Sequence, residues 1–339
     1  MKYKRIIATA YGRPEVLRLV EDEMPEPRAG EGRVKVLAAG VAFADILFRR
    51  GLLRGVQSLP FTPGFDVVGV VEQVGEGVSS VKVGDTAAAL TETGGYAQVI
   101  VLPERELVPV PSSLDPAEAV CLVLNYTTAS QLLHRVGRAL PGLRLLVHGA
   151  AGGVGTAALQ LGALSRLEMY GTASSPKHQL VRELGAVPID YKTEDMMARI
   201  QALTGTGVDL VLDPVGGANF WRSYRTLRRG GRLIGYGLSS ALRHGRLSRP
   251  AIVSSLARFA ALKLIPDGRS ASWYSVTAMK RRRPEWFRED LMTLCKFLSE
   301  QKLRPIVAQR LPLAEAARAH ELLEQAEVCG KLVLLPQAS

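Results

Sequence analysis

A glycine-rich turn between a short apolar strand and a helical stretch is the feature that most constrains the fold of this chain. The run RLLVHGAAGGVG occupies residues 144–155 and continues into AALQLGALSRL, which reads as a helix. Strand, glycine turn and helix in this order are typical of a dinucleotide-binding unit, although the spacing A-x-G-x-x-G has alanine at the first glycine position. We therefore predict that Gly152, Gly153 and Val154 lie against a pyrophosphate at the helix N-terminus. The alternative is an ordinary tight turn.

The strand after this helix indicates which nicotinamide cofactor fits. NAD-binding folds usually place Asp or Glu about 20 residues after the glycines, where it bonds the ribose 2′-hydroxyl. Here the strand EMYGTA runs into Ser174 and Ser175 and then Lys177, with no acid. Hydroxyl and ammonium groups bind a 2′-phosphate, whereas a carboxylate repels it. The sequence thus predicts NADPH, with Ser174 and Lys177 as contacts; the alternative for Lys177 is a solvated side chain at a helix start.

Size and composition fit a two-domain α/β protein without a membrane span. The chain has 339 residues, of which 47% are hydrophobic and 6% aromatic. Its N-terminus turns polar at once, unlike a signal peptide, and it lacks an apolar stretch of about 18 residues. Its three cysteines are scattered, which indicates neither a disulfide framework nor a zinc knuckle. We therefore predict a cytoplasmic protein.

The formal net charge is +11, and positive charge gathers in residues 225–232 and 280–288. The first cluster precedes an apolar strand and is interpreted as a solvated helix end. The second is a solvated face or a contact surface for RNA or lipid. The charge leaves open a second class of function, a reductase-like binding protein that uses its basic surface on RNA or vesicle lipid. Nucleic acid is the less favoured partner.

The pattern of apolar segments changes near residue 126. Before it, short segments such as RVKVLAAGV and DVVGVVEQVG are broken by Gly and Pro, which favours strands. After it, apolar strands alternate with helical stretches, which predicts a doubly wound parallel sheet with right-handed crossovers. The chain closes with a helix, a strand, a second helix and a last strand KLVLLP. Residues 239–285 are basic and only partly amphipathic, and they give no clear pattern.

Several motifs in a fixed order resemble the medium-chain dehydrogenase/reductase superfamily over nearly the whole chain. They are GVAFADILFRRG, LPFTPGFDVVGVVEQVGEGVSSVKVGD, GGYAQ, NYTTA, GAAGGVG, DPVGG and AARAHELLE followed by GKLVL. The resemblance implies a GroES-like catalytic domain, residues 1–125 completed by 279–339. It also implies a Rossmann domain between them, residues 126–278, and a homodimer formed through edge strands of the nucleotide domains.

The resemblance further points to the zinc-free quinone oxidoreductase branch. The positions of the catalytic zinc ligands of the family correspond to Ala42, Phe65 and Leu124, and none of these residues binds zinc. The four-cysteine lobe of the zinc enzymes is also absent after Gly84-Asp85. Within this branch, LVLNYTTA, GTASSPKH, PIDY and YGLSSALRHGRLSR most resemble the homologues of the synaptic vesicle membrane protein of the amine-transport type. The resemblance implies hydride transfer from NADPH to a quinone or an α,β-unsaturated carbonyl compound.

The site residues carry over unevenly. The residues that contact NADPH in this branch correspond here to Thr128, Lys177, Tyr191, Tyr236 and Gly237. Two polar residues of the usual substrate pocket are replaced by Ala42 and Leu47, which indicates a more apolar or bulkier acceptor than a quinone.

The proton donor is not evident from the sequence. Tyr126 and Asp45 are the candidate catalytic residues, against the alternatives of a packed core tyrosine and an acid that caps the next helix. His148, at the end of the first central strand, is interpreted as structural, and His134 and His320 as surface or packing residues. We expect pocket specificity to lie in Ala42 to Leu53, Tyr126 and residues 239–285.

Overall fold

The computed structural model describes residues 1–52, 58–240 and 249–338. Leu53 and residues 241–248, which include part of the predicted specificity region, lie outside the described residues. The chain divides into two compact units, Met1–Thr127 with Arg288–Ser339, and Thr128–Phe287. The domain boundaries predicted from the sequence fall after residues 125 and 278.

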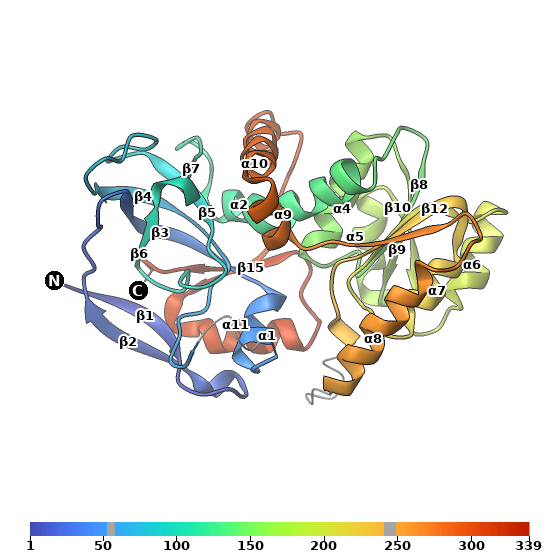
Figure 1. The fold of residues 1–339 in the computed structure, drawn as a ribbon, viewed down its shortest axis with the longest axis horizontal. Coiled ribbons are helices and arrows are strands. Elements are labelled where there is room, and N and C mark those ends of the chain that lie inside the picture. The colour runs from blue at the N-terminus through green and yellow to red at the C-terminus, as the bar shows by residue number, and fades with distance from the viewer. Residues whose placement is uncertain (53–57, 241–248, 339) are drawn as a thin grey trace. The chain divides into compact units, whose positions relative to one another are not determined.

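The first unit is built on an antiparallel sheet that uses both ends of the chain (Figure 1). Its described strands follow the order β14-β15-β3-β4-β5-β7, and β6 also pairs with β3. Only β14 and β15 run parallel. A separate antiparallel ribbon joins β1 to β2. The strands are β1 (Lys2–Ala8), β2 (Leu17–Glu23), β3 (Glu31–Val41), β4 (Asp66–Val74), β5 (Thr86–Leu90), β6 (Val99–Pro103), β7 (Val108–Pro109), β14 (Val307–Pro312) and β15 (Lys331–Leu335).

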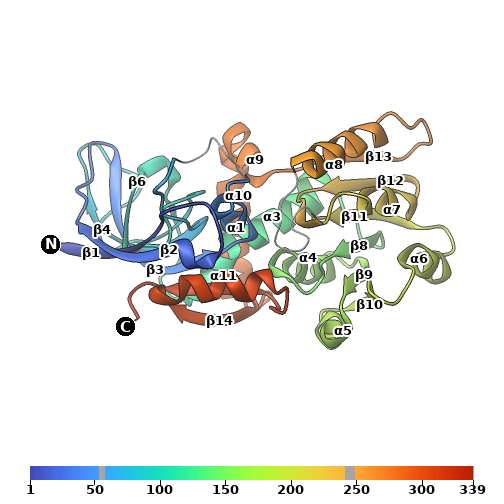
Figure 2. The ribbon, with the colours of Figure 1, turned by 90° about the horizontal axis from the view of Figure 1, so that it is seen from below.

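Helices of the first unit pack on this sheet and on one another. Short 3₁₀ turns lie at Pro14–Val16, Glu104–Glu106 and Leu313–Glu315, and a π-helical turn lies at Leu122–Tyr126. The helices are α1 (Phe43–Arg49), α2 (Pro116–Cys121), α11 (Ala316–Glu324) and most of α10 (Pro284–Ser299). Helices α1 and α11 lie side by side (Figures 1 and 2), and the fully buried Arg49 of α1 pairs with Glu324 of α11.

The second unit contains one parallel sheet with the strand order β10-β9-β8-β11-β12-β13. In chain order this is the 3-2-1-4-5-6 arrangement of a dinucleotide-binding fold. The doubly wound parallel sheet predicted from the sequence is therefore confirmed. Its strands are β8 (Arg144–His148), β9 (Glu168–Ala173), β10 (Ala186–Asp190), β11 (Val208–Asp213), β12 (Leu227–Gly235) and β13 (Ser270–Trp273).

Helices cover both faces of this sheet, with α4 on one side and α6 and α7 on the other (Figure 2). Aromatic and aliphatic residues fill the second of these layers, among them Phe220, Tyr224 and Phe259, which are all at most 3% exposed. The helices are α3 (Thr127–Ser130), α4 (Gly153–Leu164), α5 (His178–Glu183), α6 (Met196–Thr204), α7 (Asn219–Arg225), α8 (Arg249–Leu262) and α9 (Val276–Arg282); a π-helical turn spans Gln131–Val136 and a 3₁₀ turn spans Ser175–Lys177.

The interpretation of the first basic cluster is confirmed only for Arg225, which is exposed in the last turn of α7. Residues 225–232 were expected to form a solvated helix end, but α7 ends at Arg225 and the cluster continues into strand β12. Arg228 pairs there with Asp209 of the neighbouring strand β11. A cation on a strand is matched by a carboxylate across the sheet, a partner that a local reading of the sequence does not include.

Candidate functional site

The sequence fingerprint lies at the point where the strand order of the second unit reverses. Strand β8 has β9 on one side and β11 on the other, and the helices that follow β8 and β11 leave the sheet in opposite directions. In open α/β sheets the crevice at the carboxyl ends of two such strands is where ligands bind. The turn of residues 149–152 follows the carboxyl end of β8, and the loop of residues 214–217 follows the carboxyl end of β11.

The glycines of the turn have separable structural roles. Gly149 has a φ of +65°, which a residue with a side chain rarely adopts. A Cβ at Gly155 would overlap the carbonyl oxygen of Gly149, so this glycine allows close packing of α4 against the turn. Gly152 is the N-cap of α4, where it has extended backbone and no capping side chain. The N–H groups in the first turn of α4, at Gly153 and Val154, therefore have no capping side chain from this residue.

Polar side chains, none of them Asp or Glu, follow the end of β9. Ser174 is the N-cap residue of the 3₁₀ turn Ser175–Lys177, and Lys177 in turn precedes α5. Tyr191 follows β10, the next strand in the sheet, and is 56% exposed. The carboxylate of the preceding residue, Asp190, is buried and accepts the backbone N–H of Lys192 at 2.9 Å. Asp190 thus stabilises its own turn.

The segment of Tyr236 and Gly237 is attached to the loop after β11. The N–H of Tyr236 donates to the carbonyl of Asp213 at 3.0 Å, and that of Ser239 donates to Pro214 at 2.9 Å. A Cβ at Gly237 would lie 2.7 Å from the carbonyl oxygen of Pro214. Only glycine allows these two segments to approach so closely, and together they form the β11 side of the crevice.

Thr128 is the first residue of the second unit and is 5% exposed. Its hydroxyl oxygen is buried and makes no hydrogen bond to any residue that the structure describes. A buried hydroxyl without a partner is costly in a folded protein, so such an atom indicates a missing ligand or water. This orphaned atom is an observation that the sequence alone did not supply.

Asp45 of the first unit lies fully buried at the first turn of α1. Its carboxylate accepts the backbone N–H groups of Ala42 and Gly64, both at 2.9 Å, and the hydroxyl of Tyr96 at 3.2 Å. Burial raises the pKa of Asp45 to about 7, and the two backbone donors oppose that rise. The side chain therefore caps α1 and holds the segments of residues 42 and 64 together.

Tyr96 and His320 extend this buried cluster, and the sequence analysis did not assign them to it. The hydroxyl of Tyr96 lies 3.1 Å from Nε2 of His320. Burial lowers the pKa of His320 to about 3, so the ring is neutral. The GGYAQ and AARAHELLE motifs contain both residues, but no local pattern brings them together across such separations in sequence.

The positions that match zinc ligands of the family are apolar; Ala42 and Phe65 are buried and Leu124 is partly buried. Ala42, Phe65 and Leu124 offer no thiolate, imidazole or carboxylate. Among the described residues, no group of three or more His, Cys, Asp and Glu side chains is placed to hold a metal. The neighbouring Asp66 forms a buried ion pair with Lys331, with Nζ and Oδ2 2.7 Å apart. Tyr126, the other catalytic candidate, is 1% exposed.

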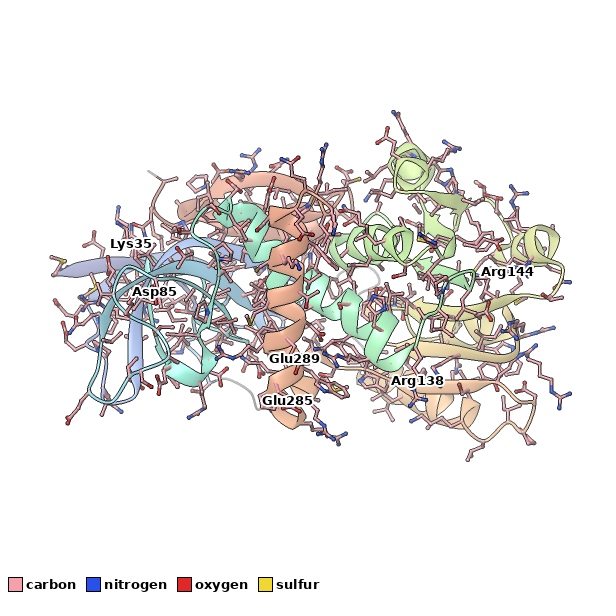
Figure 3. The ribbon with its side chains drawn as sticks, turned by 90° about the horizontal axis from the view of Figure 1, so that it is seen from above. Lys35, Asp85, Arg138, Arg144, Glu285 and Glu289 are labelled. Carbon is pink, nitrogen blue, oxygen red and sulfur yellow. The ribbon has the colours of Figure 1, made fainter. Side chains whose placement is uncertain are left out.

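The second basic cluster contains acids and aromatic contacts. Glu285 and Glu289 lie one turn apart on α10 (Figure 3), and Arg283 is 3.6 Å from the carboxylate of Glu285. The guanidinium of Arg135 lies 4.9 Å from the centre of the Trp286 ring. The carboxylate of Glu285 offsets part of the positive charge of this cluster, whereas the ring contact leaves the charge unchanged. Among the described residues, no helix has the length and apolar character needed to cross a bilayer.

Comparison with known proteins identifies the family. A model described as zinc-binding dehydrogenase matches residues 184–334, and one described as the alcohol dehydrogenase GroES-like domain matches residues 28–112. The synaptic vesicle membrane protein VAT-1 homolog of Rattus norvegicus is 31% identical over 338 residues, which cover 98% of this chain and 83% of that protein. The quinone oxidoreductase of Rattus norvegicus is 31% identical over 331 residues, 96% of this chain and 95% of that protein.

Solved structures agree with this placement. The Escherichia coli quinone oxidoreductase complexed with NADPH superposes with a TM-score of 0.88 at 29% identity, covering 98% of this chain and 100% of that one. A mycobacterial protein complexed with NADPH gives a TM-score of 0.85 at 31% identity, with the same coverage. The chain belongs to the medium-chain dehydrogenase/reductase superfamily, a family of oxidoreductases. The predicted family and the fold of a GroES-like domain plus a Rossmann domain are thereby confirmed.

Proposed function

We propose that this chain is an NADPH-dependent oxidoreductase that reduces a quinone or an α,β-unsaturated carbonyl compound without a metal ion. The observation that carries the proposal is the glycine turn of residues 149–155 at the switch point of the parallel sheet, together with the acid-free end of β9. Relatives described as quinone oxidoreductases, one of them solved in complex with NADPH, support the reaction class.

The residues around the crevice fit NADPH. The pyrophosphate would lie against Gly152, Gly153 and Val154, where the α4 N-terminus offers N–H donors and positive potential. The 2′-phosphate would contact Ser174, Lys177 and Tyr191. The nicotinamide half would contact Thr128, Tyr236 and Gly237.

Bound NADPH supplies a hydride, so the protein's task is to orient the reactants and to exclude water. A conjugated acceptor takes the hydride at the carbon β to its carbonyl, and negative charge moves to the carbonyl oxygen. A proton from water or a nearby hydroxyl completes the reduction. The hydroxyl of Tyr126 is our candidate donor. Asp45 is a positioning residue instead, because three donors already occupy its carboxylate.

The proposal of a reaction without a metal ion rests on the side chains at the family's metal position. Ala42, Phe65 and Leu124 leave the family's metal position without a side chain that binds zinc. A hydrogen-bond donor is then the group that stabilises the developing oxyanion, and conjugation lowers the charge that it must stabilise.

Cofactor oxidation against a panel of acceptors tests the proposal. NADPH turnover is measured with several quinones and enones, and the saturated ketone of matched carbon skeleton is the control for each enone. We expect turnover of conjugated acceptors and none of the saturated ketones. A salt-dependent RNA shift assay runs beside it, because phosphate-driven binding weakens steeply with salt. RNA binding without any turnover would replace the proposal with the binding-protein alternative.

A further inference from the structure

A buried chain of hydrogen bonds crosses the second unit directly beneath the cofactor crevice. Nδ1 of His148, the last residue of β8, lies 3.0 Å from Oγ1 of Thr172 on β9. Its Nε2 lies 3.0 Å from Oγ of Ser223 on α7. The Ser223 hydroxyl donates to Oδ2 of Asp213, the last residue of β11, at 2.6 Å. All four residues are at most 3% exposed.

The donors and acceptors of this series of hydrogen bonds determine which ring nitrogen of His148 carries the proton. The single hydroxyl proton of Ser223 goes to the Asp213 carboxylate, so the serine oxygen accepts from Nε2–H of His148. Nδ1 of His148 therefore accepts from the hydroxyl of Thr172. Burial lowers the pKa of His148, which agrees with a neutral ring that holds one proton.

Each end of this series of hydrogen bonds, at Thr172 and at Asp213, is attached to one wall of the crevice. On the β8 side, the carbonyl of Thr172 accepts the N–H of Ala150 within the glycine turn at 3.0 Å. On the β11 side, Oδ1 of Asp213 accepts the N–H groups of Val215 and Gly216 at 2.7 and 3.1 Å. The loop of residues 214–217 in turn holds the segment of Tyr236 through Asp213 and Pro214.

We propose that His148 is a positioning residue that fixes the loop after β11 relative to the glycine turn, and so sets the affinity for the nicotinamide half of the cofactor. This inference rests on the proposed function, since it assumes that NADPH occupies the crevice. It gives a role in binding to a histidine interpreted from the sequence as merely structural. The adenosine half, at the ends of β9 and β10, lies on the other side of the glycine turn and is independent of the loop.

Equilibrium binding of two ligands separates this role from general stabilisation. The probes are NADPH and adenosine 2′,5′-bisphosphate, which has the adenosine half and the 2′-phosphate but no nicotinamide. The variants are His148→Phe and Thr172→Val, which remove hydrogen bonds while keeping side-chain volume. Thr172→Ser keeps the hydroxyl and is the rescue variant. Thr204→Val is the matched control, because that buried hydroxyl bonds Ile200 at 2.7 Å just before β11, at the opposite edge of the sheet.

We expect His148→Phe and Thr172→Val to weaken NADPH about tenfold, the loss of roughly one buried hydrogen bond, with the bisphosphate affinity unchanged. Thr172→Ser and Thr204→Val should bind NADPH as the wild type does. Unchanged NADPH affinity in Thr172→Val, or an equal loss for both ligands, would overturn the inference, and if His148→Phe fails to fold the Thr172 pair still decides. If the wild type binds neither ligand, the proposed function itself fails.

Discussion

Replacing Lys177 with alanine tests the cofactor assignment at a single side chain. Lys177 ends the 3₁₀ turn that follows β9 and is the N-cap residue of α5. We propose that it contacts the 2′-phosphate, which NADH lacks. Lys177→Ala should therefore weaken NADPH and leave NADH nearly unchanged.

The magnitude follows from the exposure of the side chain. A charge-assisted hydrogen bond contributes roughly 1.5–3 kcal/mol when it is shielded from water. Lys177 is only partly buried, so solvent screening places the loss at the lower end. About 1.4 kcal/mol corresponds to a tenfold rise in Kd. Because the contact is ionic, the difference between wild type and variant should shrink as salt increases.

Calorimetric titration with NADPH and NADH, at low and high salt, measures these quantities. Lys263→Ala is the matched control, since it removes the same charge from an exposed site in the same unit, at the end of α8. It should leave both affinities unchanged. Equal losses for NADPH and NADH in Lys177→Ala would refute the phosphate contact, as would a loss of similar size in the control.

Further predictions address the turn, the metal, the buried histidine and the assembly. Gly153→Val should lower NADPH affinity at least about tenfold in a folded protein, whereas Gly155→Ala should lower the melting temperature. Titration calorimetry measures the first and scanning calorimetry the second. Dialysis against a strong chelator should leave turnover unchanged, and stoichiometric zinc by elemental analysis would contradict this. Because the folded pKa of His320 lies below its unfolded value, its contribution to stability is lost as pH falls below about 6.5. Urea titrations should therefore show a shallower acid-side decline for His320→Gln than for wild type. Light scattering should give twice the 36.6 kDa chain mass for the predicted homodimer.

The fold of the second unit could be predicted from the sequence because its signals are local. The apolar run of β8 and the glycines after it lie within residues 144–155, and their conformation is set by neighbours in the chain. Positive φ at Gly149 and close packing at Gly155 are requirements that only glycine meets. Alternating strands and helices then favour a parallel sheet with right-handed crossovers.

The polar clusters were missed because their members come from distant segments. Asp45 and Tyr96 are 51 residues apart in sequence, and Tyr96 and His320 are 224 apart. No periodicity reports such a contact. Residues 239–285 were unclear for a different reason: α8 buries Ser255, Phe259 and Leu262, while Val253 and Leu256 remain exposed. Apolar residues on both faces conceal the helical period.

The two units differ in how strongly the sequence determines what each contributes to the proposed function. In the second unit, backbone geometry places the glycine turn, and a buried network supports it, so the cofactor half is specified by residues that have little freedom to change. In the first unit, the positions that bind metal in related enzymes carry Ala42, Phe65 and Leu124, and the nearby charges of Asp66 and Lys331 neutralise each other. Without a side chain that binds a metal at these positions, we expect acceptors whose own conjugation spreads the developing negative charge. The identity of the acceptor therefore depends on side chains that the family's motifs do not constrain.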